Sequence, residues 1–388
     1  MEHYDVIIIG AGIAGCGLAY NLHRFCPEKK VLVIDGSKLN ENTQHHYKIL
    51  FKENKEEYNL PFIKRLKGIK NGSGNNIVAT FEDDSLYIVD YKDICKSLLK
   101  RSKADVVDEQ AIDVNYTTLT TNQNKYTFKY LVDCSGNSFF IRKKFHLPLP
   151  FRYYIGKTKV FKGKNELNKN YYYNFFTGNN FFEEIFSVND QFVYSEWCYS
   201  KQPNPNLIIT PPNTYYQSKI NKNNLQLIQK GFASIPVGPV LPIVYKNFAF
   251  LGDSFGNAAP IGGFGTLSSL RASKLLAKAI MEDDLKLYSD VWKKKYLDFH
   301  LKQLASKMDR LNNTKIMERI KNYPTTDKVI KLFSKDPKNF IQLLKNDPAW
   351  TLPENVRNAY PKRQIIFLLC NYGYLKIKYN LLSLFRGF

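Results

Sequence analysis

Residues 6–15 read Val-Ile-Ile-Ile-Gly-Ala-Gly-Ile-Ala-Gly, a run of β-branched residues followed at once by three spaced glycines. The run 6–9 predicts a strand buried on both faces. Residues 16–25 predict a helix, because their apolar side chains fall on one face. Residues 31–34 predict a second buried strand, and Asp35 follows it, where a carboxylate can accept hydrogen bonds from a ribose. A strand, a Gly-x-Gly-x-x-Gly turn, a helix and an acid about 20 positions further on are typical of dinucleotide binding.

Each glycine of the turn has a predicted task. Gly10 permits the tight turn, Gly12 lets a pyrophosphate approach the backbone, and Gly15 lets the helix pack closely against the strand. The N-terminus of the helix offers free N–H groups and the positive end of the helix dipole to phosphates, and Ile13 and Ala14 of the turn belong to the predicted cofactor site.

The pattern of apolar, aromatic and turn-forming residues along the chain predicts three regions. Residues 1–147 and 246–290 form a discontinuous Rossmann-like domain, since a buried strand and a long helix return after residue 246. Residues 148–245 alternate aromatic runs with turn signals, which predicts an antiparallel sheet as the substrate domain. Residues 291–388 read as helices broken by prolines. The predicted fold class is therefore α/β, with α+β character in the substrate domain.

The composition bounds the class of protein. Of 388 residues, 44% are hydrophobic, which argues against a disordered chain. Lys and Arg number 56 and Asp and Glu 35, giving a net charge of +21. Such a surplus suits anionic partners such as phospholipid surfaces or pyrophosphates, although a Lys-rich coding bias gives the same charge. No helix-turn-helix, zinc-finger or RNA-binding signature is present, so nucleic acid is not an expected partner.

Cysteine spacing and hydropathy bear on the compartment. The six cysteines contain no CxxC pair, so neither a metal site nor a disulfide framework is expected. No apolar run approaches the about 20 residues that span a bilayer, and no signal peptide pattern is present. We expect a cytoplasmic protein, soluble or attached to the inner face of the membrane. Residues 363–388 form a basic amphipathic pattern that suits either an anionic bilayer or a packed terminal helix.

Three separated elements resemble the FAD-dependent oxidoreductases of the para-hydroxybenzoate hydroxylase type. They are the turn 10–15 with Asp35, the segment 133–136 (Asp-Cys-Ser-Gly) with Arg142, and residues 252–265, which read GDSFGNAAPIGGFG. The last element most resembles the geranylgeranyl reductase branch, in which a GDAAG motif precedes a PxxGxG motif that opens a helix. The resembling blocks frame most of residues 1–145 and 235–282.

The resemblance implies FAD as the cofactor. The turn glycines and Asp35 would hold its ADP half, and Asp253 would bind its ribityl or pyrophosphate part. Gly263 and Gly265 would bring backbone N–H groups close to the flavin ring, at the N-terminus of a helix. A helix N-terminus there stabilises the negative charge of reduced flavin. The neighbouring residues Gly252, Pro260 and Phe264 complete the implied cofactor site.

The reductase branch implies an activity as well. It implies reduction of a C=C bond of an isoprenoid or another apolar small molecule, by hydride transfer from N5 of reduced flavin. The aromatic meander at residues 171–199 suits an apolar tunnel, and it suits ordinary packing in an antiparallel sheet equally. No second dinucleotide fingerprint is present, so the electrons would come from a ferredoxin or from NAD(P)H that docks transiently.

The sequence also departs from the family pattern. Tyr91 stands where the family often has Arg, and residues 45–47, His-His-Tyr, stand where the reductase branch often has a Cys-Gly-Gly patch.

Lycopene cyclases share this architecture, and Glu196 matches one acid of their acidic pair. Glu196 is therefore a candidate catalytic acid, because burial beside an apolar substrate raises a carboxyl pKa, although a Glu on a strand often only faces solvent. A cyclase without net redox chemistry, an FAD-dependent monooxygenase or halogenase, and a flavin-binding protein without catalysis stay open as alternatives.

Overall fold

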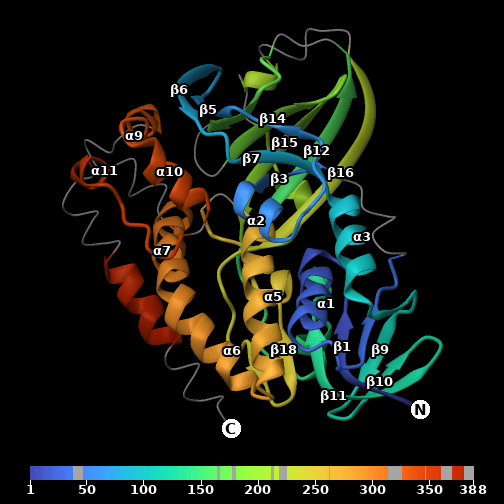
Figure 1. The fold of residues 1–388 in the computed structure, drawn as a ribbon. Helices are drawn as coiled ribbons and strands as arrows, with labels where there is room; N and C mark the ends of the chain where they lie inside the picture. The colour runs from blue at the N-terminus through green and yellow to red at the C-terminus, as the bar shows by residue number, and fades with distance from the viewer. Residues whose placement is uncertain are drawn as a thin grey trace.

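The computed structural model describes residues 1–37, 47–163, 167–176, 181–210, 214–217, 225–261, 263–312, 326–345, 347–359 and 369–379. Side chains are described for the same ranges, except at 306–312 and 326–327. This part of the chain forms sheets of eight, seven and three strands with helices around them (Figure 1).

The eight-stranded sheet carries the glycine-rich turn. Its main path runs β17-β18-β11-β1-β2-β8, and the hairpin β9–β10 extends from β11. The strands from β18 to β8 on this path pair in parallel, so their carboxyl ends share one edge, where ligands of such sheets bind. The strands are β1 (Glu2–Ile9), β2 (Val31–Ile34), β8 (Asp105–Val107), β9 (Ala111–Val114), β10 (Thr118–Thr121), β11 (Lys125–Asp133), β17 (Val244–Tyr245) and β18 (Phe248–Phe250).

The predicted βαβ unit is present. Helix α1 (Ile13–Phe25) follows β1 and lies between α3 (Tyr91–Ser102) and α5 (Gly265–Met281) (Figure 1). A Cβ on Gly15 would lie 2.0 Å from the Gly10 carbonyl oxygen. A Cβ on Gly10, whose φ is +103°, would lie 2.4 Å from the Cys134 carbonyl oxygen. Only glycine at both positions lets α1 start this close to the sheet.

The seven-stranded sheet has the order β16-β12-β15-β14-β13-β5-β6 and is antiparallel except where β13 pairs with β5. This pairing corrects the expected domain boundary, since residues 68–82 were expected in the FAD-binding domain and lie in the substrate sheet. Parallel pairing between segments a hundred residues apart leaves no local sequence signal. The strands are β5 (Gly68–Ser73), β6 (Asn76–Glu82), β12 (Tyr153–Lys162), β13 (Tyr171–Phe176), β14 (Phe181–Val188), β15 (Gln191–Ser200) and β16 (Gln226–Pro236).

The three-stranded sheet connects the two larger layers. It contains β3 (Tyr47–Phe51), β4 (Lys64–Arg65) and β7 (Leu86–Asp90), with helix α2 (Lys52–Glu57) after β3. β7 runs directly into α3, whose N-cap Asp90 accepts hydrogen bonds from two backbone N–H groups. Because Tyr47 on β3 pairs with Asp90, the sheet brings Lys48 and Tyr91 to the same place.

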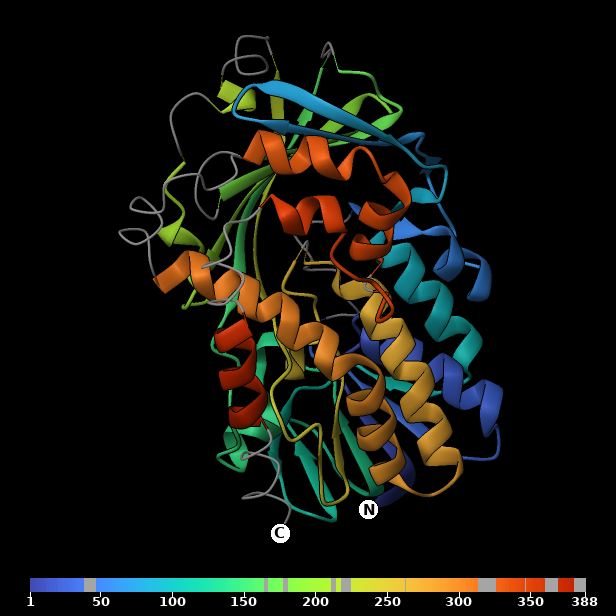
Figure 2. The same cartoon turned by 90° about the vertical axis from the view of Figure 1, so that its left-hand side faces the viewer.

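The C-terminal region is helical, as expected. Its helices run along one side of the molecule (Figure 2). They include α6 (Leu285–Trp292), a π-helical turn η5 (Lys293–Leu297), α7 (Asp298–Asn312), α9 (Thr326–Phe333), α10 (Pro337–Leu344), α11 (Glu354–Asn358) and helical residues 369–379. Earlier short elements are α4 (Phe140–Lys144), η1 (Gly136–Ser138), η2 (Pro205–Leu207) and η4 (Gly252–Phe255). No helix in the described ranges is both long and apolar enough to cross a bilayer.

Arg142 on α4 links residues 252–265, which we call the cofactor loop, to the segments next to it. Its fully buried guanidinium donates hydrogen bonds to the carbonyl oxygens of Ser254 at 2.7 Å and Pro148 at 3.0 Å. It also donates to those of Val240 at 2.8 Å and Pro242 at 2.9 Å. Burial lowers the pKa of Arg142 to about 9. One side chain therefore satisfies four carbonyl groups on three segments, through two buried and two partly buried hydrogen bonds.

Replacing Arg142 tests this role. Arg142→Met keeps an unbranched apolar stem and leaves the four carbonyl groups without their donor. We expect the free energy of unfolding to fall by about 3–5 kcal/mol, measured by urea denaturation. The exposed neighbour is the control, and Lys143→Met should stay within about 0.5 kcal/mol of the parent. Equal losses in the two variants would contradict the assignment.

Candidate active site

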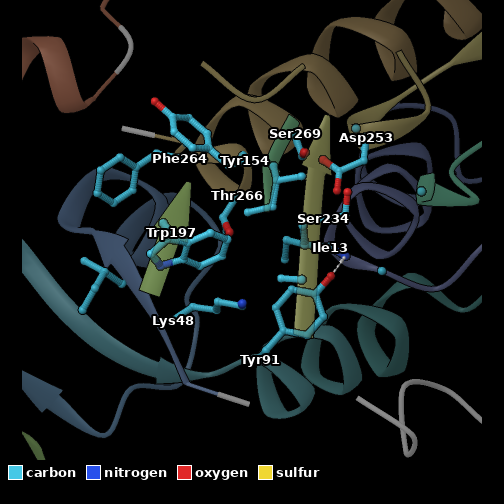
Figure 3. Close-up of a pocket in the computed structure, with 18 of the residues that line it drawn as sticks. Ile13, Lys48, Tyr91, Tyr154, Trp197, Ser234, Asp253, Phe264, Thr266 and Ser269 are labelled. Atoms are coloured by element: carbon cyan, nitrogen blue, oxygen red, sulfur yellow. Dashed lines mark hydrogen bonds between the residues drawn. The ribbon is translucent and has the colours of Figure 1, made fainter. Parts of the chain in front are cut away.

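A cavity of about 610 Å³ lies where the carboxyl edge of the eight-stranded sheet meets the inner face of the seven-stranded sheet (Figure 3). This volume is within the range of small-molecule and cofactor sites. Eight of the predicted cofactor-binding residues line it: Gly12, Ile13, Ala14, Gly252, Asp253, Gly263, Phe264 and Gly265. The predicted residues Gly10, Gly15, Asp35, Pro260 and Glu196 do not.

The N-terminus of α1 faces the cavity. Its first intrahelical hydrogen bond runs from Cys16 N to Gly12 O, so the preceding N–H groups have no acceptor within the helix. Ile13 N donates to the Tyr91 hydroxyl at 2.9 Å (Figure 3). Burial raises the pKa of Tyr91, so the hydroxyl keeps its own proton. Tyr91, in the position where the family often has Arg, thus offers the phosphate site a neutral donor beside the helix dipole.

Asp35 lies behind this turn. Its carboxylate accepts hydrogen bonds from Ala11 N at 3.1 Å and from Ser37 N at 2.8 Å and Ser37 Oγ at 2.6 Å. These contacts fix the carboxylate beside the backbone of the glycine-rich turn. The backbone of the turn therefore orients the carboxylate of Asp35, the residue predicted to bind the ribose.

The loop after β18 brings a second helix N-terminus to the cavity. Gly263 has a φ of +67°, and a Cβ there would lie 3.2 Å from the Tyr154 ring. Tyr154 on β12 donates its hydroxyl to Pro260 O at 2.7 Å, which fixes the loop to the seven-stranded sheet. Pro260 therefore acts through its carbonyl group behind the cavity, and α5 begins at Gly265 on the cavity side.

Asp253 is the acid of the cofactor loop. Burial raises its pKa from 3.8 to about 6, and the positive charge of Lys48 opposes this rise. No hydrogen bond from the described part of the chain reaches its carboxylate, which points into the cavity (Figure 3). A carboxylate that points into the cavity without a donor from the described residues can accept hydrogen bonds from the hydroxyl groups of a ribityl chain.

These features fit FAD. Two helix N-termini open on one cavity, Gly12 leaves room for a phosphate, and no described residue donates a hydrogen bond to Asp253. In such a complex the α1 end would hold the diphosphate and Asp253 would accept hydrogen bonds from the ribityl hydroxyls. The α5 end, at Gly263 and Gly265, would lie against the flavin ring.

The seven-stranded sheet contributes an aromatic wall opposite the cofactor loop. Phe182, Glu184 and Phe186 alternate along β14, so they share the inner face, and Trp197 on β15 pairs with Phe182. Trp197 Nε1 donates to Glu184 at 2.7 Å. Burial raises the pKa of Glu184, and hydrogen bonds from Tyr172 and Trp197 partly offset this rise. The wall therefore holds one carboxyl group inside an apolar surface.

Glu196 lies on the other face of the same sheet. It pairs with Glu183 across β14–β15, and β-strand alternation turns both side chains away from the cavity. Glu196 accepts a hydrogen bond from Thr210 Oγ1 at 2.6 Å and lies 3.6 Å from Lys159 Nζ. The structure thus does not bring this sequence candidate together with the cofactor-binding residues.

Sequence reasoning missed Glu184 and Lys48. Both line the cavity, and burial lowers the pKa of Lys48 to about 8. The available signal for Glu184 was the Phe-x-Glu-x-Phe alternation at 182–186, which marks an acid on an aromatic strand face. No signal distinguished Lys48 from other lysines. Within the described residues, no cluster of His, Cys, Asp and Glu could hold a metal ion, and His45 and His46 lie outside these residues.

Comparisons with known proteins agree with this geometry. The family model for pyridine nucleotide-disulphide oxidoreductases matches residues 4–170. A geranylgeranyl bacteriochlorophyll reductase-like protein from Thermoplasma acidophilum has a similar structure, with a TM-score of 0.71 at 15% identity. The match covers 95% of this chain and 100% of that one. No curated protein sequence matches the chain significantly.

Two further solved structures have the same fold. A flavin-dependent brominase has a TM-score of 0.66 at 14% identity, over 92% of this chain and 98% of its own. The p-nitrophenol 4-monooxygenase of Pseudomonas putida has a TM-score of 0.63 at 13% identity, over 89% and 99%. The predicted fold class is confirmed. The family match and the shared fold support the class expected from the sequence, an FAD-binding flavin-dependent oxidoreductase.

Asp253 gives a test of the cofactor site. Its raised pKa means that the ionised carboxylate destabilises the folded, flavin-free protein above pH about 6. We expect Asp253→Asn to raise the free energy of unfolding at pH 8 by about 1–3 kcal/mol. The gain should shrink as the pH falls through 6 toward 4, where both states protonate the acid. Urea denaturation at several pH values measures it.

The same substitution should weaken FAD binding by about tenfold, because a carboxylate acceptor is lost. Flavin fluorescence titration measures the affinity. Asp113→Asn is the control, since Lys144 lowers the pKa of this exposed acid far from the cavity. It should neither stabilise the protein nor change FAD affinity. An Asp253→Asn variant with unchanged stability and affinity would refute the assignment.

Proposed function

We propose that the chain is an FAD-dependent reductase that adds hydrogen across a C=C bond of an isoprenoid substrate. The observation that carries the proposal is Glu184, a carboxyl group with a raised pKa on an aromatic wall that faces the cofactor loop. Reduction of a C=C bond requires a hydride on one carbon and a proton on the other. Bound reduced FAD supplies the hydride.

Glu184 supplies the proton in this proposal. Burial keeps the carboxyl group protonated at higher pH than an exposed Glu, and the hydrogen bond from Trp197 fixes its orientation. A Cβ on Gly156 would lie 2.5 Å from the Trp197 ring, so this glycine leaves the space in which the indole lies. After the transfer, Glu184 is a carboxylate and takes a proton from solvent before the next turnover. The aromatic side chains around it exclude water from the reacting carbons.

Two variants on adjacent strands test the acid. Glu184→Gln removes the transferable proton, and we expect turnover to fall by about 10²–10⁴-fold. Glu196→Gln is the matched control on the opposite face, and its turnover should stay within about threefold of the parent. Single-turnover oxidation of the reduced flavin by the substrate measures both. A larger loss in Glu196→Gln would favour the cyclase-like alternative and overturn the choice of acid.

The reaction itself is tested by mass. The FAD-loaded protein is reduced with dithionite, mixed anaerobically with geranylgeraniol and analysed by mass spectrometry. We expect the product to gain two hydrogens per reduced bond, and both are deuterium when the reaction runs in D₂O, because the N5–H of reduced flavin and the carboxyl proton of Glu184 both exchange with solvent. A product of unchanged mass would indicate cyclisation, and a gain of one oxygen after exposure to air would indicate a monooxygenase. Either product would overturn the proposal. In the cell, ferredoxin or NAD(P)H is the proposed electron donor.

We also propose peripheral attachment to an anionic membrane surface, through helical residues 369–379. Leu369, Tyr374 and Ile377 are 61%, 55% and 62% exposed on this helix, and Lys376 lies among them. Its other face is anchored to the protein, where Leu375 and Tyr379 are buried. A basic helix with an exposed apolar stripe suits a lipid interface.

Vesicle binding tests this surface. We expect the double variant Leu369→Ser and Ile377→Ser to lose binding to phosphatidylglycerol vesicles by at least about tenfold, because apolar burial in the interface is lost. Ile209→Ser is the control, since Ile209 is 87% exposed in another part of the fold. Co-sedimentation measures the bound fraction. Equal binding of all variants would contradict this surface.

A further inference from the structure

Lys48 is a basic residue that lines the cavity. It lies on β3, and its ammonium group points into the cavity between Trp197 and Tyr91 (Figure 3). Its Nζ lies 6.0 Å from the centre of the Tyr91 ring. It is the only Lys or Arg among the described residues that line the cavity.

The surroundings of Lys48 leave its charge uncompensated. No acidic group of the described chain lies within ion-pairing distance of Nζ, and burial disfavours the charged form. Glu184 and Asp253 act on it over a longer distance, and Glu184 has the larger effect. Burial raises the pKa of both acids, that of Asp253 to about 6, so Asp253 is largely ionised near neutral pH without forming an ion pair with Nζ in the described structure. Lys48 is partly exposed to the cavity, and an ammonium group that its surroundings desolvate without an ion-paired anion is costly, unless a ligand provides that anion.

The position of Lys48 separates it from the phosphate site. The N-terminus of α1 already meets the Tyr91 hydroxyl, whereas Lys48 approaches the ring of Tyr91 and lies beside the aromatic wall. Its ammonium group lies beside Trp197 of this wall (Figure 3). The wall around it consists of Phe182, Phe186 and Trp197 with Tyr172. A ligand that complements this surface is apolar along its body and anionic at one end.

We propose that Lys48 is a specificity-determining residue that binds an anionic group, a carboxylate or a phosphate, on the substrate. The inference rests on the proposed function for the isoprenoid body of the substrate, and it adds the charged end. The ammonium group donates charge-assisted hydrogen bonds to the anion. Binding thereby holds the apolar chain against the aromatic wall, in reach of Glu184.

Matched probes test the charge preference without turnover. Farnesol, farnesoic acid and farnesyl phosphate share one apolar chain and differ at the end group. Each is titrated into the oxidised FAD-loaded protein, and binding is followed by the change in flavin absorbance. We expect the two anions to bind about tenfold to a hundredfold more tightly than farnesol. The comparison of the two anions shows which of them the site prefers.

Lysine variants link this preference to Lys48. Lys48→Met should bring all three affinities to that of farnesol, and Lys48→Arg should restore the preference for anions. Lys52→Met, at a lysine outside the cavity, should behave as the parent. The free affinity of each variant for FAD is measured in parallel and should change less than about threefold.

The pH dependence gives a second signature. The groups that face Lys48 are Glu184 on β14, Asp253 on η4 and Tyr91 on α3. The pKa of Lys48 is about 8, so in the parent the preference should fall as the pH rises above 8. In Lys48→Arg it should persist, because Arg stays charged. Tyr91 keeps its proton in this range, since burial raises its pKa.

Distinct outcomes separate this inference from the proposed function. Equal affinities for acid and alcohol in the parent would overturn the role of Lys48, even if both compounds are reduced. A lysine-dependent preference without reduction of either compound would support the role and overturn the reductase. Loss of FAD affinity in Lys48→Met would assign the lysine to the cofactor and overturn the inference.

Discussion

The close approach of helix α1 to strand β1 is the constraint on which the rest of the structure depends. A side chain on Gly15 would collide with the Gly10 carbonyl group, and one on Gly10 with the carbonyl group of Cys134. Because these side chains are absent, the start of α1 sits at the carboxyl edge of the parallel sheet. Its free N–H groups then face the cavity, where Tyr91 meets them. The buried hydrogen bonds of Arg142 hold the neighbouring cofactor loop in register with this edge.

The second sheet determines which side chains reach the cavity. Glu184 and Glu196 lie on adjacent strands, and their parity in the pleat sends them to opposite faces. On the inner face, an acid stands among aromatic rings. On the outer face, Glu183 and Glu196 satisfy Thr210, Tyr194 and nearby backbone groups. The seven-stranded sheet therefore forms a wall of the site with its inner face and holds the segments at residues 210 and 214–217 with its outer face.

The charges in the cavity reflect a balance between stability and ligand binding. Burial shifts the pKa of Lys48 downward and those of Glu184 and Asp253 upward, so the charged form of each group is less stable here than in water. The folded protein carries this cost without gaining ion pairs from it. Groups of this kind cluster at functional sites, because a bound ligand compensates them. A diphosphate at the N-terminus of α1, hydroxyl groups at Asp253 and an anionic end of the substrate at Lys48 would provide these interactions.

The sequence by itself determined the local pattern of the cofactor domain. The strand at residues 31–34 was predicted to the residue, and the glycine-rich turn and a long helix after residue 246 were also predicted, because buried strands, tight turns and amphipathic helices leave short-range signals. It also identified most of the residues around the cofactor loop. Only the tertiary structure decided that residues 68–82 join the substrate sheet and that Glu184 faces the cavity in place of Glu196. It also decided that Lys48 lies in the cavity with no ion-pair partner among the residues that the structure describes. These outcomes depend on strand register and on contacts between segments far apart in the chain, and no local pattern of residues encodes such contacts.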